Sequence, residues 1–419
     1  MIALIVVLLI IIVLYCLNRH MCHSCRREGY EKPLGMREIY LNTNSTYRPV
    51  HGKFNQSDML YPETSQSMND LEEVKQKLKK LVCANDEDEI IFVSSCSEAI
   101  ASVFHWISLE SPYTTICGTE HDHSTIRENA ELYNFIYDST SLKKRYIPDN
   151  TSCITLTHVD PTTGEIIDIE NYISILSQYK FIDELVNNNE DDIGISGDKL
   201  LQYRPVTMLD ATQSIGKIYI DIHGHKNEID VVVASLHKLG FPLNFSGIII
   251  LNKSVKDRFV PLVAGSQQNG MRGGSYNPDG LIENMHLLDH RDNRESRKQK
   301  WEEAYNFFTE KGLNVYKPKG EHLYNTLLID TNNHCTLELI TELSSKYGIY
   351  LGNKTACKNE PQKRGGSKKK NNDKQTAGSK QLKPFDNAVR ISFIDPVVLT
   401  RDSMEKIASE ISKELASEE

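Results

Sequence analysis

The sequence predicts an α/β protein built on a mostly parallel sheet. Residues 205–209 and 229–235 are nearly continuous apolar runs, typical of strands that are buried on both faces. Asp210 ends the first run and Lys238 follows the second. Both side chains are therefore expected at the carboxyl ends of buried strands, where open α/β sheets bind ligands.

Other segments fit the same architecture. Residues 89–93 form an apolar strand pattern that turns into a helix pattern, and residues 282–311 show one long charged helix pattern that could connect two domains. A further helix is predicted over residues 70–82 by four apolar residues at helical spacing. These residues are Leu71, Val74, Leu78 and Leu81.

The length of 419 residues suffices for two domains. We expect a large domain over residues 50–287 and a smaller α+β domain that combines residues 18–49 with 288–419. The net charge of −9 argues against general nucleic-acid binding. Nine cysteines without disulfide-type spacing favour a reducing compartment. Cys22 and Cys25 form the only metal-like pair, so no metal site is predicted, and these two cysteines are more plausibly acylated or free.

The amino-terminal segment is predicted to be a membrane anchor. Residues 1–17 are uncharged and almost wholly apolar, close to the lower length limit of a spanning helix. Arg19, Arg26 and Arg27 follow the run, so the positive-inside rule places the rest of the chain in the cytosol. A secretory signal would need a basic start and a small-residue cleavage site. We therefore expect an uncleaved single-pass helix; the alternative is a helix packed on the folded domain.

The pair of Asp210 and Lys238 suits one cofactor in particular. Pyridoxal phosphate needs a lysine for a Schiff base and an acid that keeps its ring nitrogen protonated. Taken singly, each residue has an ordinary explanation, Asp210 as a turn cap and Lys238 as a solvated loop residue.

Taken together, these segments resemble a known family. Asp210-x-x-Gln213 and Ser235-x-His237-Lys238 are similar to the cofactor segment of the cysteine desulfurases, the NifS-like branch of the class V aminotransferases. The resemblance covers most of the chain beyond residue 38. It implies a pyridoxal-phosphate-dependent transferase of fold type I, with Lys238 as the catalytic lysine. It also implies that Asp210, Gln213, Ser235 and His237 bind pyridoxal 5'-phosphate.

Two further segments resemble the cofactor-binding parts of that family. The resemblance puts Cys96 and Ser97 at the phosphate, and a helix amino terminus after a strand is a physical anion site. In residues 119–124, it makes His121 the histidine that stacks on the ring and moves protons. His123 is expected on the surface or behind the site.

The resemblance also implies a homodimer and a substrate site. In the glycine-rich loop of residues 265–275, Ser275 would reach the phosphate of the neighbouring subunit. Asn44 lies in a segment that partly matches the family's Asn-rich turn, and it would bind substrate. Arg390 would clamp the substrate carboxylate by bidentate pairing; otherwise an arginine between Val389 and Ile391 is an edge residue whose charged end reaches water.

The sulfur chemistry implied by the resemblance depends on Cys357, in a segment similar to the family's mobile cysteine loop. Its thiolate would attack the sulfur of cofactor-bound cysteine, leaving alanine and an enzyme persulfide. Cys83, Cys117, Cys153 and Cys335 are expected to be small buried hydrophobic residues.

Two departures from the family pattern stand out. Pro161 replaces an asparagine near the ring oxygen and offers neither a side-chain donor nor a backbone N–H. Residues 358–386 form an insertion rich in Lys, Asn, Gly and Gln, which is too polar to fold alone. We interpret this insertion as a solvated loop or as an electrostatic contact for an acidic acceptor or nucleic acid.

The resulting expectation is a membrane-anchored, homodimeric cysteine desulfurase that passes sulfur from L-cysteine to an acceptor protein. The alternatives are a selenocysteine lyase or related β-eliminating lyase, which Pro161 would permit, and an inactive membrane scaffold. The joint presence of Lys238, Asp210, His121, Cys357 and Arg390 argues against the scaffold.

Overall fold

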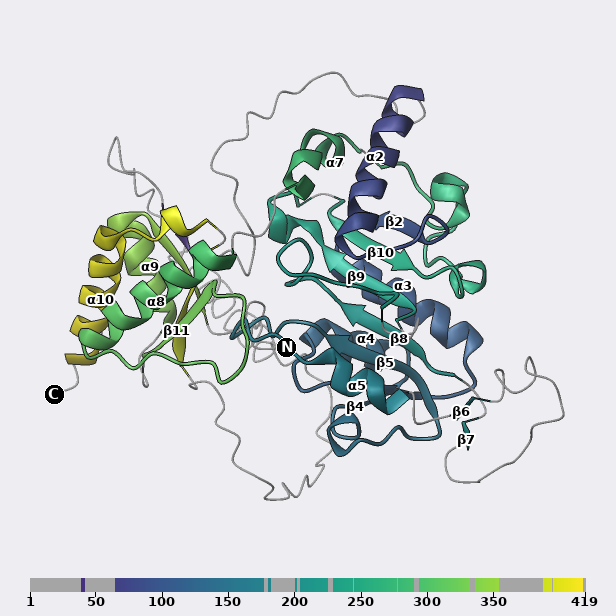
Figure 1. Cartoon of the computed structure of the whole chain (residues 1–419), viewed down its shortest axis with the longest axis horizontal. Helices are drawn as coiled ribbons and strands as arrows, with labels where there is room; N and C mark the ends of the chain where they lie inside the picture. Colours follow the sequence, from purple (N-terminus) through teal and green to yellow (C-terminus); the bar gives the residue numbers. More distant parts are fainter. Residues whose placement is uncertain are drawn as a thin grey trace, which may run out of the picture.

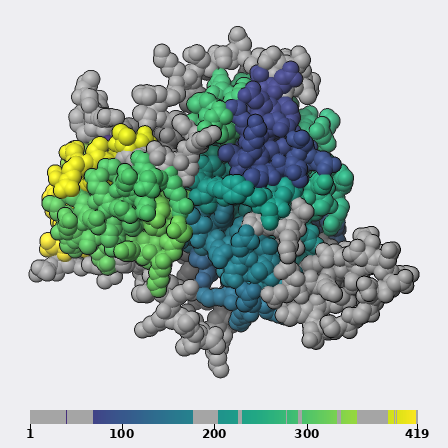
Figure 2. Space-filling view, viewed as in Figure 1, coloured from purple at the N-terminus to yellow at the C-terminus, as the bar shows by residue number. Residues whose placement is uncertain are grey.

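The computed structural model shows two bodies side by side, each built on its own sheet (Figure 1). Space-filling atoms show the smaller body lying against one side of the larger (Figure 2). The structure describes residues 39–41, 65–176, 180–181, 200–201, 204–224, 229–243, 245–276, 278–289, 294–331, 336–353, 387–393 and 395–416.

The larger body contains a seven-stranded sheet of order β2-β10-β9-β8-β5-β3-β4. Strand β10 is antiparallel to both of its neighbours, whereas the five strands from β9 to β4 run parallel to one another. This confirms the predicted α/β class with a mostly parallel sheet. The strands are β2 (Glu89–Val93), β3 (Thr115–Cys117), β4 (Ile136–Asp138), β5 (Thr151–Thr157), β8 (Val206–Asp210), β9 (Val231–Ser235) and β10 (Gly247–Leu251).

Helices cover both faces of this sheet, because alternate strand residues point to opposite sides. Ile90 and Phe92 of β2 pack with one group of helices, and Ile91 and Val93 pack with the other. The first group is α2 (Ser65–Leu81), α5 (Ile169–Leu176) and α7 (Asp279–Glu283). The second is α3 (Cys96–Glu110) and α4 (Ser124–Leu132).

The smaller body has a four-stranded sheet of order β1-β12-β13-β11 with a single apolar core. Its strands are β1 (Ile39–Leu41), β11 (Thr326–Asp330), β12 (Ile349–Asn353) and β13 (Ala388–Ser392). Its helices are α8 (Arg294–Glu310), α9 (Thr336–Tyr347) and α10 (Arg401–Ala416). Strand β1 pairs in parallel with β12, so the chain enters the smaller body before it builds the larger one.

Short elements complete the described structure. Strands β6 (Lys180–Phe181) and β7 (Leu200–Leu201) pair with each other. The 3₁₀ turns are η1 (Leu142–Lys144), η3 (Leu236–Leu239), η4 (Lys256–Arg258), η5 (Gln267–Gly270), η6 (Met285–Asp289) and η7 (Pro396–Val398).

A turn after β5 joins the two bodies. The Ile166 N–H donates to the Glu321 carbonyl at 2.8 Å, and the Leu323 N–H donates to the Gly164 carbonyl at 2.9 Å. The Glu165 carboxylate accepts from the Lys319 N–H at 2.9 Å. The segment that leaves β5 therefore forms part of the contact with the smaller body.

The single helix expected over residues 282–311 is wrong: Asn284 ends α7, and η6 lies before α8. Asp289 of η6 pairs with Lys77 of α2 at 2.5 Å, which ties this turn to the larger body.

No helix within the described ranges is long and apolar enough to span a membrane. The expected anchor, residues 1–17, lies outside the described residues.

Candidate active site

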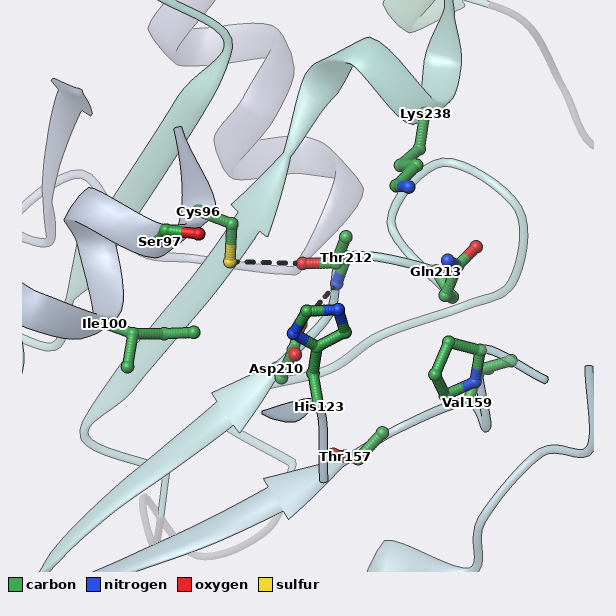
Figure 3. Close-up of a pocket in the computed structure, with 11 residues that line it drawn as sticks. Cys96, Ser97, Ile100, His123, Thr157, Val159, Asp210, Thr212, Gln213 and Lys238 are labelled. Carbon is green, nitrogen blue, oxygen red and sulfur yellow. Dashed lines mark hydrogen bonds between the residues drawn. The ribbon is translucent and has the colours of Figure 1, made fainter. Parts of the chain in front are cut away.

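One pocket gathers most of the predicted cofactor residues at the carboxyl ends of β5 and β8, beside the start of α3 (Figure 3). Its empty volume is about 540 Å³, part of it open to solvent. The lining residues are Cys96, Ser97, Ile100, His123, Thr157, Val159, Pro161, Asp210, Thr212, Gln213 and Lys238.

Asp210 and Lys238 face this pocket from two adjacent strand ends. Asp210 is the last residue of β8, is 8% exposed, and accepts a hydrogen bond from the Thr212 N–H at 2.9 Å. Lys238 lies in η3, directly after β9, and is 6% exposed. Gly240 ends η3 with a φ of 105°, a left-handed conformation that favours glycine. Figure 3 shows Lys238 entering the pocket from the side opposite Asp210.

Ser235 and His237 lie behind Lys238. The Ser235 hydroxyl and His237 Nδ1 are 2.6 Å apart, and Ser246 lies 3.5 Å from the same nitrogen. Neither Ser235 nor His237 lines the pocket. Their described contacts brace the turn that presents Lys238.

The corner between β2 and α3 supplies the anion-binding end of the pocket. Ser95 caps α3 by accepting from the Glu98 N–H, and Cys96 and Ser97 form the first turn. A Cβ at Gly247 would lie 2.3 Å from the carbonyl carbon of Ser95, so only glycine allows β10 to approach this corner. The free N–H groups of a helix start favour a phosphate here.

Cys96 contributes a thiol group to this corner. The Thr212 hydroxyl donates to its sulfur at 3.2 Å. Burial, followed by the charge of Asp210, raises the pKa of the Cys96 thiol well above its usual range. Cys96 is therefore neutral and unreactive, which is compatible with a neighbouring phosphate.

The turn after β3 carries two histidines, and only His123 lines the pocket. His121 Nδ1 lies 2.8 Å from Asp160 Oδ2, and His121 does not line the pocket. His123 lines the pocket and caps α4 by accepting from the Thr125 N–H. The sequence analysis placed His123 on the surface or behind the site, although its position directly before residues 124–132 was a usable signal for an N-cap residue.

A buried carboxylate, Asp122, sets the orientation of both histidines. Thr119, Tyr137 and Thr157 donate to it at 2.6, 3.0 and 2.8 Å, and the Thr155 hydroxyl donates as well. Burial raises the pKa of this carboxyl, and the four hydroxyl donors act in the opposite direction. Since Asp122 points into the protein, its neighbours on either side are directed elsewhere.

The remaining predicted residues lie away from the pocket or outside the described part of the chain. Ser275 is exposed on the glycine-rich loop that comes after β10. Arg390 is fully buried in the middle of β13, opposite Leu328 of β11. Asn44 and Cys357 lie outside the described residues, as does the insertion 358–386. Thr157, Val159 and Thr212 line the pocket without having been predicted.

Comparison with known proteins identifies related sequences. Residues 37–183 match the model of the aminotransferase class-V family. The cysteine desulfurase IscS of Histophilus somni is 24% identical over 199 residues, which are 45% of this chain and 44% of that protein. The IscS of Plasmodium falciparum is 25% identical over 228 residues, covering 51% of this chain and 37% of that protein. The match thus spans less than half the length of these relatives.

Solved structures show the same fold over almost the whole chain. A NifS-like protein has a TM-score of 0.67 at 19% identity and covers 91% of this chain and 100% of its own. The cysteine desulfurase CsdA of Escherichia coli has a TM-score of 0.64 at 15% identity, covering 90% of this chain and 95% of its own. A ureidoglycine–glyoxylate aminotransferase of Bacillus subtilis also shares the fold, with a TM-score of 0.62 at 12% identity over 93% of this chain and 95% of its own.

The pocket residues fit pyridoxal phosphate. A lysine and a carboxylate face one cavity from opposite sides, and a capped helix start with Ser97 lies beside them. The family match confirms this predicted cofactor. No His, Cys, Asp and Glu cluster suited to a metal ion occurs in the described ranges. Residues 37–183 thus match the aminotransferase class-V family, and the fold of the chain is that of the NifS-like proteins.

Proposed function

We propose that this protein is a pyridoxal-phosphate-dependent cysteine desulfurase that converts L-cysteine to L-alanine and holds the sulfur as a persulfide on Cys357. The placement of Lys238 and Asp210 in one pocket beside the start of α3 carries this proposal. The curated relatives named as cysteine desulfurases support the choice of substrate.

Each of these pocket residues has a separate role in the proposed reaction. Bound pyridoxal phosphate supplies an electron sink conjugated to the substrate Cα. Asp210 keeps the ring nitrogen protonated, and Lys238 holds the cofactor and carries the proton that leaves Cα. The N–H groups at the start of α3, with Ser97 and Thr212, bind the phosphate. His123, on the pocket wall, is placed to stack on the ring and move protons.

The sulfur step is a displacement at the substrate sulfur. The Cys357 thiolate forms an S–S bond to that sulfur, the C–S bond breaks, and its electron pair stays with the carbon framework. Protonation of this carbon framework releases alanine. Arg390 binds the substrate carboxylate in this proposal, and Asn44 contacts the substrate.

Cys357→Ser tests the sulfur step. The variant should bind the cofactor and L-cysteine, because other residues make those contacts, but it should form no persulfide and release almost no alanine. Alanine analysis and persulfide labelling measure this, with the partly exposed Cys83→Ser as the matched control. Undiminished turnover by Cys357→Ser would contradict the proposal. A wild-type protein that binds the cofactor but is inert towards cysteine and selenocysteine would favour an inactive scaffold.

A second candidate activity rests on Pro161. The structure places this proline on the pocket wall, where the family pattern has an asparagine. A ring oxygen without that donor would change the electron sink, which favours a selenocysteine lyase or another β-eliminating lyase. Turnover of selenocysteine by Cys357→Ser at the wild-type rate, with no turnover of cysteine by the wild type, would select this activity.

A homodimer accompanies the proposed chemistry. Val260, Leu262 and Val263 are exposed apolar residues directly before the glycine-rich loop, which is a typical composition for a subunit contact. Ser275 would then reach the cofactor phosphate of the second copy. Light scattering should give twice the chain mass, and Leu262→Asp should shift the protein towards monomer.

The membrane anchor is proposed on composition alone. Residues 1–17 carry no charge and are followed by arginines, which favours a single-pass helix with the catalytic body in the cytosol. The full chain should resist alkaline carbonate extraction, whereas a version that starts at Gly29 should be soluble. Full-length protein that washes off membranes would overturn this proposal.

A further inference from the structure

The glycine-rich loop is fastened to β2 through the side chain of Gln268. Its amide donates to the Phe92 carbonyl and accepts from the Phe92 N–H, both at 2.8 Å. Strand β2 is at the edge of the sheet, so these backbone groups have no strand beside them among the described residues. The Gln268 amide satisfies both groups. It fixes the loop to the strand that leads into the corner between β2 and α3, which is called the phosphate corner and consists of Ser94, Ser95, Cys96 and Ser97.

The same loop is fastened to α3 through Arg272. Its Nε donates to Glu98 Oε1 at 2.9 Å, and both side chains are only 15% exposed. The other oxygen of Glu98 accepts from the Ser94 N–H at 2.8 Å and from the Ser94 hydroxyl. Glu98 therefore holds the phosphate corner with one oxygen and the glycine-rich loop with the other.

Aromatic contacts fix the far end of the loop. The guanidinium of Arg272 lies 4.7 Å from the centre of the Phe245 ring, and Tyr276 stacks on that ring at 5.0 Å. Tyr276 directly follows Ser275, the exposed residue expected to reach a second subunit. The position of Ser275 thus depends on contacts that begin at the phosphate corner.

The loop backbone needs these contacts to keep its conformation. Gln268 and Asn269 have φ values of 48° and 57°, a left-handed region that is unfavourable for residues with a side chain. A Cβ at Gly273 would lie 2.1 Å from the Ala264 carbonyl oxygen, so the two arms of the loop pack closely. A strained backbone of this kind persists only while neighbouring contacts hold it.

We propose that Gln268 and Arg272 are positioning residues that couple occupation of the phosphate corner to the order of the glycine-rich loop. The inference rests on the proposed function, because it takes pyridoxal phosphate as the ligand of that corner. A phosphate bound at Cys96 and Ser97 orders the first turn of α3, and Glu98 of that turn holds Arg272. By linkage, an ordered loop raises the affinity for the phosphate by the same factor.

Hydrogen exchange of the full chain tests this coupling. Addition of pyridoxal 5'-phosphate should slow amide exchange in residues 265–276, although these residues do not line the pocket. Pyridoxal, which lacks the phosphate, should bind Lys238 without protecting the loop. Equal protection by both compounds, or no protection by either, would overturn the proposal.

Variants separate the coupling from general stability. Arg272→Gln and Gln268→Leu should each abolish the phosphate-dependent protection and weaken binding of pyridoxal 5'-phosphate about tenfold, but leave binding of pyridoxal nearly unchanged. The matched control is Arg258→Gln, which breaks an Arg Nε–Glu Oε1 pair at 2.5 Å with Glu110, at the other end of α3. The control should behave like the wild type in both assays.

The outcomes also distinguish this inference from the proposed function. A wild-type chain that never binds pyridoxal 5'-phosphate contradicts the proposed function. Wild-type binding with protection that survives in Arg272→Gln and Gln268→Leu contradicts only the coupling. Glu98→Gln combined with Arg272→Gln should weaken cofactor binding no more than either change alone, since both remove one interaction. Additive losses would overturn the coupling through Glu98.

Discussion

The carboxyl ends of β8 and β9 and the turn after β3 contribute to the same pocket in different ways. At the strand ends, Asp210 and Lys238 both face the cavity. In the turn, His121 contacts Asp160 outside the lining, and the pocket receives His123 instead. Adjacent parallel strands fix the residues at their carboxyl ends, whereas the orientation of a turn depends on which of its residues are buried.

The difference lies in the origin of the contacts that hold each region. Backbone ladders place the strand ends: Asp210 is in register with Val233 of β9, and the Ala211 N–H donates to the Val233 carbonyl. The turn is held by Asp122, which accepts hydroxyls from β4 and β5 as well as from its own turn. These partners are distant in sequence, so a short motif does not specify the orientation of the turn.

The largest expected effect tests the strand ends. Lys238→Ala should abolish the visible band of the bound cofactor and lower turnover by about 10³-fold or more, because it removes both the covalent link and the proton carrier. Borohydride treatment of the wild type should bleach the band and label Lys238, which peptide mass spectrometry can detect. Label on another lysine would refute the assignment. Lys217→Ala provides a comparison with a second buried lysine on the segment after β8.

The sequence predicted the strands more reliably than the turns. Residues 89–93 and the ends at Asp210 and Ser235 agree with the structure, because apolar runs bounded by polar residues determine buried strands. The division of residues 282–311 was missed, because helical spacing continues across the end of α7 at Asn284. The position of His123 on the pocket wall was not predicted, because the hydroxyls around Asp122 come from four separate positions in the sequence.

The second prediction compares the two histidines directly. His123→Gln should lower turnover about 10²-fold and shift the absorption of the bound cofactor, since His123 lines the pocket. His121→Gln should change turnover by less than about tenfold, because His121 acts on the pocket only through Asp160 and the turn that carries Pro161. Absorption spectra and steady-state rates of both variants check this. The reverse ranking would restore His121 as the proton-handling residue.

The third prediction concerns the buried carboxylate that orients the turn. Asp122→Ala should lower the free energy of unfolding by about 3 kcal/mol, because it leaves four hydroxyl donors without their acceptor. Asp138→Ala is the control; this less buried aspartate caps its own turn through Thr140 and Ser141, and its loss should cost about 1 kcal/mol. Urea unfolding measures both. Equal losses would mean that the Asp122 cluster does not hold the turn.

The smallest expected effect is the pH dependence of the pair His121–Asp160. Burial lowers the pKa of His121, but the hydrogen bond and charge of Asp160, together with the charges of Glu120 and Asp122, leave the pKa raised. The pKa of Asp160 is lowered, against its own burial, by His121 and by nearby N–H groups. Because the pKa of His121 is raised in the folded state, its protonated form stabilises the fold. This stabilisation is complete below the unfolded pKa of about 6.5 and is lost as pH rises through the folded pKa. The stability from Asp160 is present above its unfolded value of about 3.9 and is lost as pH falls through the lowered folded pKa.

The pair should therefore contribute most between those limits, by about 1 kcal/mol at pH 5 to 6. The difference in urea midpoint between the wild type and His121→Gln should shrink as pH rises from 6 to 9, whereas turnover measured at one fixed pH should differ little between them. A difference that stays constant over this range would show that His121 is held by packing rather than by its charge. In that case the turn after β3 would be fixed by Asp122 alone, and the contrast with the strand ends would rest on one buried carboxylate.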